Sequence, residues 1–350
     1  MNILLMTDKL TTGGAEHYFC KLENELNHPE LVFYTAASGG ELYKNIYHKN
    51  RFMPMSRRNH AANLSMIKRK VMEHDIDVIH ANSLRMVLYA AWVQKLIRKQ
   101  LKIIYTKHNV TMMEKKLRPA FVRLLNSSVM KVITVSGYEE KNLIRLGVHP
   151  DKVTTIYNGV DLKQFAYRQK ESEGVCKVGI LARLSPEKNH ELFLEIAKQL
   201  KAESGLRFYI GGDGPQYQKI RQQIEALQLT HCVEMIGAVA APERFIQEMD
   251  ILLLTSHREV FPMVILEAMA VGTPVISIDT GGIKEAIISD EVGCLIPDYS
   301  AERFCRQILA WKENERWRHK VADCAYDRVT KSFSLEKMVH LTMNEYLDTH

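Results

Sequence analysis

Residues 256–278 read SHREVFPMVILEAMAVGTPVISI and follow a buried-strand pattern, DILLLT, at 250–255. Pro262 stands where a helix would begin, because its fixed φ suits the first turn and its missing N–H is not needed there. Gly272 is placed to end that helix before the strand PVISI at 274–278. The stretch therefore predicts strand, loop, helix and strand in succession, the repeating unit of a parallel α/β sheet.

Two glutamates, Glu259 and Glu267, stand eight positions apart in this stretch. Glu259 falls in the loop at the carboxyl end of a strand, where open α/β sheets bind their ligands. Glu267 falls inside the following helix, some ~8 Å further along at 1.5 Å per residue. The two carboxylates can therefore reach separate parts of an extended ligand, and helix-terminal amides nearby favour a charged group such as a diphosphate. This spacing suits a nucleotide-sugar.

The composition is that of a globular protein. The chain has 350 residues, 46% of them hydrophobic and 25% charged, which is enough for two domains with a core each. No apolar run reaches the ~18 residues that predict a membrane-spanning helix, and the first residues lack the pattern of a secretory signal. Six scattered cysteines, with no C-x-x-C and no zinc spacing, are typical of reduced thiols. We therefore expect a cytoplasmic protein.

Charge is distributed unevenly along the chain. Residues 1–160 hold 24 Lys and Arg against 13 Asp and Glu, whereas the remainder holds 23 against 28. The basic half is expected to meet something negative, for which nucleic acid, an anionic membrane surface and a phosphorylated acceptor are all candidates. Segment 112–128 mixes basic and apolar residues, which favours contact with an anionic membrane or a lipid-pyrophosphate acceptor. A domain helix with a solvated basic face is the alternative.

Short apolar segments alternate with helix-like segments in both halves of the chain. In the first half the strand-like segments are 2–7, 31–36, 77–81, 102–106, 131–136 and 153–157, with helix-like segments at 15–27, 60–74 and 84–99. After a polar stretch at 162–174, which is expected to be a linker, the strand pattern restarts at 176–182, 207–211, 232–237, 250–255, 274–278 and 293–297. We predict two Rossmann-like α/β domains, 1–160 and 173–332, that face a central cleft.

Six motifs, in order, resemble those of the retaining GT-B glycosyltransferases of family 4 (group 1 glycosyltransferases), and together they cover nearly the whole chain. They are Gly13-Gly14-Ala15-Glu16, His108-Asn109, Asn158 to Asp161, Arg183 with Glu187-Lys188-Asn189, Gly212 to Pro215, and Glu259 to Glu267. The resemblance implies that the first domain binds the acceptor, the second binds the nucleotide-sugar, and a terminal helix at 333–350 returns to the first. One departure is Val260, where the family usually has glycine.

The resemblance also implies roles for single residues. Arg183 and Lys188 would bind the diphosphate and stabilise its charge as the sugar leaves. Glu259 would bind hydroxyls of the donor sugar, Glu267 those of the ribose, and His108 would contact the sugar near its reacting carbon. The expected catalytic residues are His108, Arg183, Lys188 and Glu259. The expected nucleotide-sugar-binding residues are Gly13, Gly14, Arg183, Lys188, Glu259, Val264 and Glu267.

Other motifs have competing interpretations. Gly13-Gly14 lacks the full glycine pattern and the acidic residue of a dinucleotide site, which disfavours a dehydrogenase. Pro215 is expected at the first position of a helix, and Thr280-Gly281-Gly282 either supplies amides to a phosphate or only turns the chain. Asp75-Ile76-Asp77 matches a metal-binding pattern, but it precedes its strand and so lies at the wrong end of the sheet for a ligand. His80 is expected to be structural.

The function predicted is retaining transfer of a sugar from a nucleotide-diphosphate sugar, with UDP or GDP as carrier. The acceptor would be a hydroxyl of a glycan or lipid-linked molecule in surface polysaccharide or lipopolysaccharide biosynthesis, with peripheral contact at the inner face of the plasma membrane. No metal or other cofactor is expected, because two cations can hold the diphosphate. Three alternatives are a nucleotide-sugar epimerase on the same fold, a non-catalytic sugar-nucleotide sensor, and a nucleic-acid-binding protein, for which no motif is visible.

Overall fold

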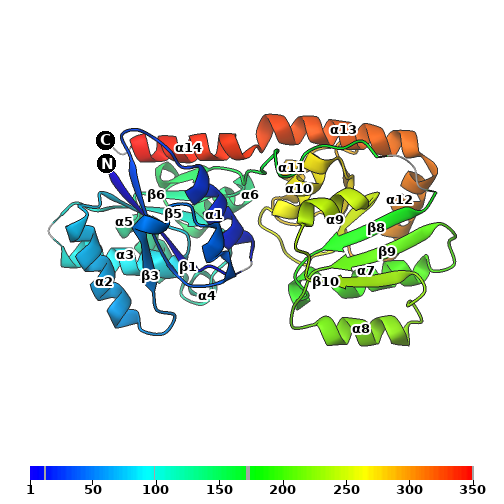
Figure 1. Ribbon diagram of the computed structural model, residues 1–350, viewed down its shortest axis with the longest axis horizontal. Coiled ribbons are helices and arrows are strands. Elements are labelled where there is room, and N and C mark those ends of the chain that lie inside the picture. Colours follow the sequence, from blue (N-terminus) through cyan, green and yellow to red (C-terminus); the bar gives the residue numbers. More distant parts are fainter. Residues whose placement is uncertain (12, 98, 171–173, 349–350) are drawn as a thin grey trace. The chain divides into compact units, whose positions relative to one another are not determined.

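Figure 1 shows the computed structural model of the chain, which describes residues 1–11, 13–97, 99–170 and 174–348. The chain divides into two compact units: unit 1 comprises Met1–Asn158 and Leu335–His350, and unit 2 comprises Gly159–Ser334. Each unit is built on one parallel β-sheet with helices on both faces. The predicted class, two Rossmann-like α/β domains, is therefore confirmed.

The sheet of unit 1 has seven parallel strands in the order β3-β2-β1-β4-β5-β6-β7. The strands are β1 (Asn2–Lys9), β2 (Val32–Ser38), β3 (Phe52–Met55), β4 (Val78–Ala81), β5 (Lys102–Lys107), β6 (Lys131–Thr134) and β7 (Val153–Thr155). The sequence analysis missed only β3, whose FMPM segment contains Pro54. Proline cannot donate to a strand ladder, but β3 lies at the edge of the sheet, where that loss is tolerated.

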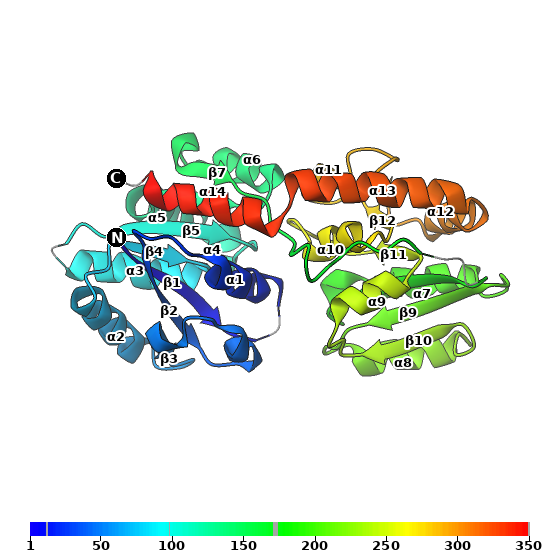
Figure 2. The ribbon, with the colours of Figure 1, turned by 45° about the horizontal axis from the view of Figure 1, so that its top comes forward.

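Helices cover both faces of this sheet. They are α1 (Gly14–Glu25), α2 (His60–Glu73), α3 (Leu84–Leu96), α4 (Met112–Lys116), α5 (Arg118–Ser128), α6 (Gly137–Leu146) and α14 (Leu335–Leu347), with short 3-10 turns at Glu41–Asn45, Lys49–Arg51 and Pro150–Lys152. Leu4 and Met6 of β1 lie in the core formed with α2, α3 and α5, while Ile3 and Leu5 lie in the core formed with α1 and α14. Figure 2 shows α14 packed beside α1. The central strand is thus buried on both faces.

The sheet of unit 2 has six parallel strands in the order β10-β9-β8-β11-β12-β13. The strands are β8 (Cys176–Leu181), β9 (Leu206–Gly211), β10 (Val233–Gly237), β11 (Ile251–Leu254), β12 (Val275–Ile278) and β13 (Cys294–Ile296). The helices are α7 (His190–Gln199), α8 (Tyr217–Ala226), α9 (Pro242–Glu248), α10 (Met263–Val271), α11 (Ile283–Ala286), α12 (Ala301–Glu313) and α13 (Glu315–Ser332), with a 3-10 turn η4 at Pro186–Lys188. All six strands correspond to predicted segments.

The chain crosses from one unit to the other twice, and residues of unit 2 next to the two crossings are bonded to each other. The first passage is at Asn158–Gly159 and the second at Ser334–Leu335. The backbone N–H of Val160 donates to the carbonyl of Phe333 at 2.9 Å, and Val160 forms a β-bridge with Ser334. The motif that begins at Asn158 therefore holds the two passages together.

The described residues of the polar stretch predicted as a linker belong to unit 2. Phe165 is buried, and the ammonium of Lys170 donates to the hydroxyl of Thr273 at 3.1 Å. Residues 171–173 of this stretch, residue 98 of a predicted helix and residues 349–350 of the predicted terminal helix lie outside the described residues.

Segment 112–128 forms two helices, α4 and α5, that meet at Leu117. Pro119 lies in the first turn of α5, where it has no N–H to donate and its ring would clash with the carbonyl four residues earlier, so one continuous helix is interrupted there. Phe121 and Leu125 are fully buried, which accounts for the apolar side of α5 as domain core.

Candidate functional site

Helix α10 contains Glu267 and follows the loop that carries Glu259. Pro262 is its N-cap, so the helix begins at Met263, one residue later than predicted, and Gly272 ends it in the left-handed conformation with φ of 82°. Pro262 provides no side-chain cap for the first N–H groups of the helix, which include that of Val264. Uncapped amides at a helix N-terminus favour an anion.

Gly281 fixes the loop that carries Glu259. It has a φ of 60°, and a Cβ at this position would lie 1.8 Å from the carbonyl oxygen of Glu259. The N–H of Gly282 donates to the carbonyl of Val260 at 3.0 Å. The glycines of this motif therefore turn the chain against the Glu259 loop. Val260 is not among the described residues with positive φ, so a valine fits its backbone without strain.

Lys188 and Glu259 bind each other. The Nζ of Lys188 lies 2.6 Å from Oε1 of Glu259, and their side chains are 26% and 10% exposed. Two further bonds join the loops that carry them: the hydroxyl of Thr255 donates to the carbonyl of Lys188 at 3.0 Å, and the N–H of His257 donates to the carbonyl of Glu187 at 2.9 Å. The loops that follow β8 and β11, neighbours in the sheet, are thus bonded to each other at three points.

Arg183 and Glu267 lie on the same two segments. Arg183 follows β8, is exposed, and forms no ion pair with any other described residue. Glu267 is half-buried on α10, and its neighbours Leu266 and Ala268 are fully buried. Unit 2 therefore carries Arg183, Lys188, Glu259, Val264 and Glu267 on the segments that follow β8 and β11.

The Gly212 loop approaches the backbone of the segment that carries Arg183. Gly212 has a φ of 133°, and a Cβ there would lie 1.9 Å from the carbonyl oxygen of Ala182. Glycine is thus required at position 212, because two backbone segments lie too close together there for a side chain. Pro215 was predicted as the first residue of the next helix, but this was wrong: Gln216 is the N-cap and α8 begins at Tyr217.

Gly13 and Gly14 begin α1 in unit 1. Gly13 is the N-cap with an extended backbone and no side-chain cap, and Gly14 is the first helical residue. A Cβ at Gly14 would meet nothing within 4 Å, and one at Gly13 would meet only the flexible carboxylate of Glu16. The packing of the described residues does not itself require glycine at either position.

His108 follows β5 in unit 1. Its Nε2 lies 3.1 Å from Oδ1 of Asn82, and its ring packs edge-on against Tyr18 with 4.5 Å between ring centroids. Desolvation lowers the pKa of His108 to about 3, and the charges of His80 and Lys107 act in the same direction. The ring is therefore neutral at physiological pH. The sequence analysis missed both Asn82 and Tyr18, because nothing in local spacing brings the ends of β4 and β5 together with α1.

His80 joins three elements inside unit 1. Its Nδ1 lies 2.5 Å from the hydroxyl of Tyr346 on α14, and its Nε2 lies 2.6 Å from the hydroxyl of Thr106 on β5. Burial lowers the pKa of His80 to about 3. Both nitrogens are engaged by the protein, so this histidine serves the packing of α14.

A buried ion cluster lies directly before His108. The Nζ of Lys107 is 2.5 Å from Oε1 of Glu139 on α6 and 3.1 Å from Oε2 of Glu114 on α4, and all three side chains are buried. The amide of Asn142 donates to both carboxylates, at 3.2 and 3.3 Å. These bonds connect the end of β5 to two helices and so fix the chain that leads into His108.

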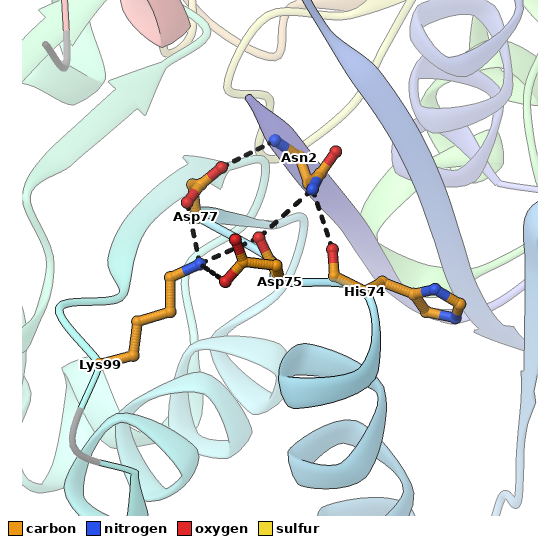
Figure 3. Close-up of polar contacts among 5 residues, drawn as sticks. All are labelled: Asn2, His74, Asp75, Asp77 and Lys99. Carbon is orange, nitrogen blue, oxygen red and sulfur yellow. Dashed lines mark hydrogen bonds and ion pairs between the residues drawn. The ribbon is translucent and has the colours of Figure 1, made fainter.

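Asp75 and Asp77 lie at the amino end of β4, as the sequence predicted. Figure 3 shows the ammonium of Lys99 between them, 2.6 Å from Oδ1 of Asp75 and 2.9 Å from Oδ1 of Asp77. The other carboxylate oxygen of Asp77 accepts the backbone N–H of Asn2 at 2.9 Å, and the amide of Asn2 donates to the carbonyl of His74. These aspartates therefore bind a lysine and the start of β1.

Within the described residues, no three His, Cys, Asp or Glu side chains gather in a way that could hold a metal ion. None of the described helices is both long enough and apolar enough to cross a bilayer.

Two family models match consecutive parts of the chain: Glycosyltransferase Family 4 over residues 12–164 and Glycosyl transferases group 1 over residues 164–328. The chain is 30% identical to WcaL of Salmonella typhimurium, named as a colanic acid biosynthesis glycosyltransferase, over 51% of this chain and 46% of that protein. It is 24% identical to N-acetyl-alpha-D-glucosaminyl L-malate synthase of Bacillus anthracis, over 78% of this chain and 75% of that protein. The chain spans about half the length of the WcaL proteins it matches.

The structure resembles that of HepE from Anabaena. The complex of HepE with UDP has a TM-score of 0.86 and 20% identity, with 100% of both chains covered, and its complex with UDP-glucose has a TM-score of 0.85. At this identity the likeness concerns the fold.

Proposed function

Because the chain belongs to the group 1 glycosyltransferases of the GT-B fold, we propose that it transfers a sugar, with retention of configuration, from a nucleotide-diphosphate sugar to an acceptor hydroxyl. The observation that carries this proposal is the ion pair of Lys188 and Glu259 at 2.6 Å. It joins a cation and a carboxylate on neighbouring loops, one of which also carries Arg183 and the other of which leads into the uncapped start of α10. Cations and helix amides suit a diphosphate, and a carboxylate suits sugar hydroxyls.

The proposed reaction is a front-face substitution. The bond from the anomeric carbon to the phosphate oxygen breaks while the acceptor oxygen bonds to the same face of that carbon. The acceptor proton passes to the leaving phosphate oxygen. Arg183 and Lys188 stabilise the negative charge that develops on the diphosphate, a role worth ~10²–10³ in rate per contact in comparable sites. Because two cations already neutralise the diphosphate, the proposed reaction needs no metal.

Unit 2 is proposed to bind the donor and unit 1 the acceptor. Glu259 would bind the sugar hydroxyls, Glu267 the ribose, and the amides near Val264 the phosphates. Gly13, Gly14 and His108 would contact the donor from unit 1. UDP is the favoured carrier, supported by the HepE complexes with UDP and UDP-glucose, and GDP is the second candidate.

The acceptor is proposed to be a glycan or lipid-linked saccharide in surface polysaccharide or lipopolysaccharide biosynthesis. The similarity to WcaL, named for colanic acid biosynthesis, supports this class of acceptor. A cytoplasmic enzyme that extends a lipid-linked saccharide works at the inner face of the membrane, and unit 1 carries features that suit such a surface.

Two exposed apolar groups in unit 1 support peripheral membrane contact. Met112 and Leu117 are 61% and 60% exposed and flank the exposed basic residues Lys115 and Lys116. Leu88, Trp92 and Leu96 lie four residues apart on one side of α3, and Trp92 is 59% exposed. Exposed aromatic and aliphatic groups beside lysines are typical of surfaces that bind anionic bilayers.

Vesicle co-sedimentation tests the membrane proposal. We expect binding to phosphatidylglycerol vesicles that weakens at high salt and is reduced in Trp92→Ala and in Lys115→Glu with Lys116→Glu. Ile288→Ala, at an equally exposed residue of unit 2, is the control and should bind as the wild type does. Equal binding by all variants would contradict the proposed surface.

A thermal-shift panel of UDP-, GDP-, ADP- and dTDP-sugars tests the proposed donor. The stabilising donor is then followed alone and with lipid-linked saccharides: an isomerised sugar indicates the epimerase, and binding without turnover indicates the sensor. Lys188→Ala and Glu259→Ala should each lose turnover. If both kept the wild-type rate, the proposed roles would be wrong.

A further inference from the structure

Asn82 is a buried residue that connects three parts of unit 1. It follows β4, is 5% exposed, and donates its backbone N–H to the carbonyl of Met6 on β1 at 2.8 Å. Its side-chain Nδ2 donates to the carbonyl of Ala15 in the first turn of α1 at 3.3 Å. Its Oδ1 lies 3.1 Å from Nε2 of His108. One side chain therefore joins the glycine turn at the start of α1 to the histidine after β5.

The two side-chain bonds of Asn82 determine how its amide is oriented. The carbonyl oxygen of Ala15 can only accept a hydrogen bond, so the NH₂ group of Asn82 must face it. The amide oxygen then faces His108, and this oxygen can only accept. A bond between Oδ1 and Nε2 consequently requires the proton of His108 to be on Nε2.

The second nitrogen of His108 then carries a lone pair. Its Nδ1 has no hydrogen-bond partner among the described residues, and this atom is not fully buried. Tyr18, four residues into α1, packs edge-on against the same ring and limits its rotation. The ring is thus held by Asn82 at one nitrogen and by its packing against Tyr18, while Nδ1 is not fully buried.

We propose that Asn82 is a positioning residue that holds His108 as the Nε2–H tautomer, so that Nδ1 accepts a hydrogen bond from a hydroxyl of the donor sugar. The contact with the sugar rests on the proposed function, but the tautomer does not. A neutral ring with its lone pair on Nδ1 is an acceptor only at that atom. In this role His108 orients the sugar and donates no proton to the leaving group.

Imidazole nitrogen chemical shifts test the tautomer directly. Full-length protein is labelled with ¹⁵N-histidine, and the signals of His108 are assigned by their loss in His108→Gln. We expect the Nε2–H pattern from pH 6 to 8 in the wild type, and loss of that single pattern in Asn82→Ala. The control is Asn63→Ala, because Asn63 is an equally buried asparagine of unit 1 that bonds to Ser56 and Tyr89. Its replacement should leave the His108 signals unchanged.

Turnover of the stabilising donor tests the consequence for the reaction. Asn82→Ala should lower kcat by about 10- to 100-fold, the size of effect expected when a contacting group is misplaced. Asn82→Asp keeps an acceptor against Nε2, so it should retain more activity at pH 8. The carboxylate raises the pKa of His108 toward neutrality, so this variant alone should lose activity as pH falls from 8 to 6, when Nδ1 becomes protonated.

Three results overturn the inference. An Nδ1–H pattern in the wild type, or an unchanged pattern in Asn82→Ala, excludes the positioning role. Wild-type turnover in His108→Gln excludes the contact with the sugar, whichever tautomer the spectra show. The spectra require no donor, so a failure of the proposed function, seen as absence of any nucleotide-sugar binding, is distinguished from a failure of the tautomer assignment.

Discussion

The ammonium of Lys188 lies 2.6 Å from the carboxylate of Glu259, so two residues expected to hold different parts of a donor bind each other. The pair is partly exposed, at 26% and 10%, and it bridges the loops after β8 and β11. In the proposed reaction Lys188 serves the phosphates and Glu259 the sugar. The ion pair therefore holds Lys188 and Glu259 in place before either of them binds the proposed donor.

Exchanging these two residues separates their structural role from their proposed chemical role. In the double variant Lys188→Glu with Glu259→Lys the ion pair can form again, and a partly exposed pair contributes only ~0–1 kcal/mol. We expect an unfolding free energy within about 1 kcal/mol of the wild type, but loss of donor turnover by ~10²–10³-fold because the phosphates would meet a carboxylate. Chemical denaturation and nucleotide release measure the two quantities. Turnover near the wild-type rate would argue that the pair is only structural.

Gly281→Ala should displace the Glu259 loop. The added Cβ would lie 1.8 Å from the carbonyl of Glu259, in addition to the strain of a φ of 60°. Gly237→Ala is a matched control, since Gly237 has a φ of 75° but a Cβ added there would meet no atom within 4 Å. We expect the control to lose about 1–2 kcal/mol of unfolding free energy from the backbone alone. Gly281→Ala should lose more and should also weaken donor binding, which the thermal-shift assay detects; equal losses would contradict the steric argument.

Lys107→Met should be strongly destabilising. It would leave the carboxylates of Glu114 and Glu139 buried without their cation, at a cost of ~3–5 kcal/mol. Adding Glu139→Gln should recover part of that loss. Lys198→Met is the control, because the pair of Lys198 with Glu195 is 46% and 43% exposed and should contribute about 0–1 kcal/mol. Urea denaturation of the four proteins provides the comparison, and a small effect of Lys107→Met would contradict the buried cluster.

His80 should make the protein sensitive to acid. Burial lowers its pKa from 6.5 to about 3 in the folded state, so the unfolded chain binds a proton that the folded chain does not. The unfolding free energy should therefore fall as pH decreases from about 6.5 toward 3, by up to ~1.4 kcal/mol per pH unit from this group. His80→Gln removes that contribution and should give a shallower slope in unfolding measurements between pH 6.5 and 4. Parallel slopes would exclude His80 as a source of the pH dependence.

The sequence predicted the strands of unit 2 because each is a short apolar run between glycine, proline or polar turns. The same logic placed α10 and its αL ending at Gly272. The sequence analysis missed β3, because the rule against proline in strands does not apply to Pro54 at the edge of the sheet. It also placed Pro215 at the first position of a helix, whereas this residue precedes α8. It also predicted a linker at 162–174, whereas the described residues of this stretch belong to unit 2, with Phe165 buried.

The partners of the expected site residues were beyond the reach of the sequence. Lys188 and Glu259 are 71 positions apart, and Asn82 and His108 are 26 apart. These contacts depend on which strands become neighbours, and no local pattern contains the order β8-β11 or β4-β5. The sequence motifs therefore identified several candidate residues, but the strand order of the folded sheets determines which of these residues contact each other.

Helix α14 completes the core of unit 1, where Tyr346 bonds to His80, yet it follows the whole of unit 2 along the chain. During translation the ribosome must deliver unit 2 before it delivers α14. The nascent first unit consequently waits with the surface that α14 will cover, next to Ile3 and Leu5 of β1, still open to water or to a chaperone. Unit 2 is one continuous segment and needs no later part of the chain for its core. Unit 1, although it is synthesised first, is therefore expected to complete its folding last.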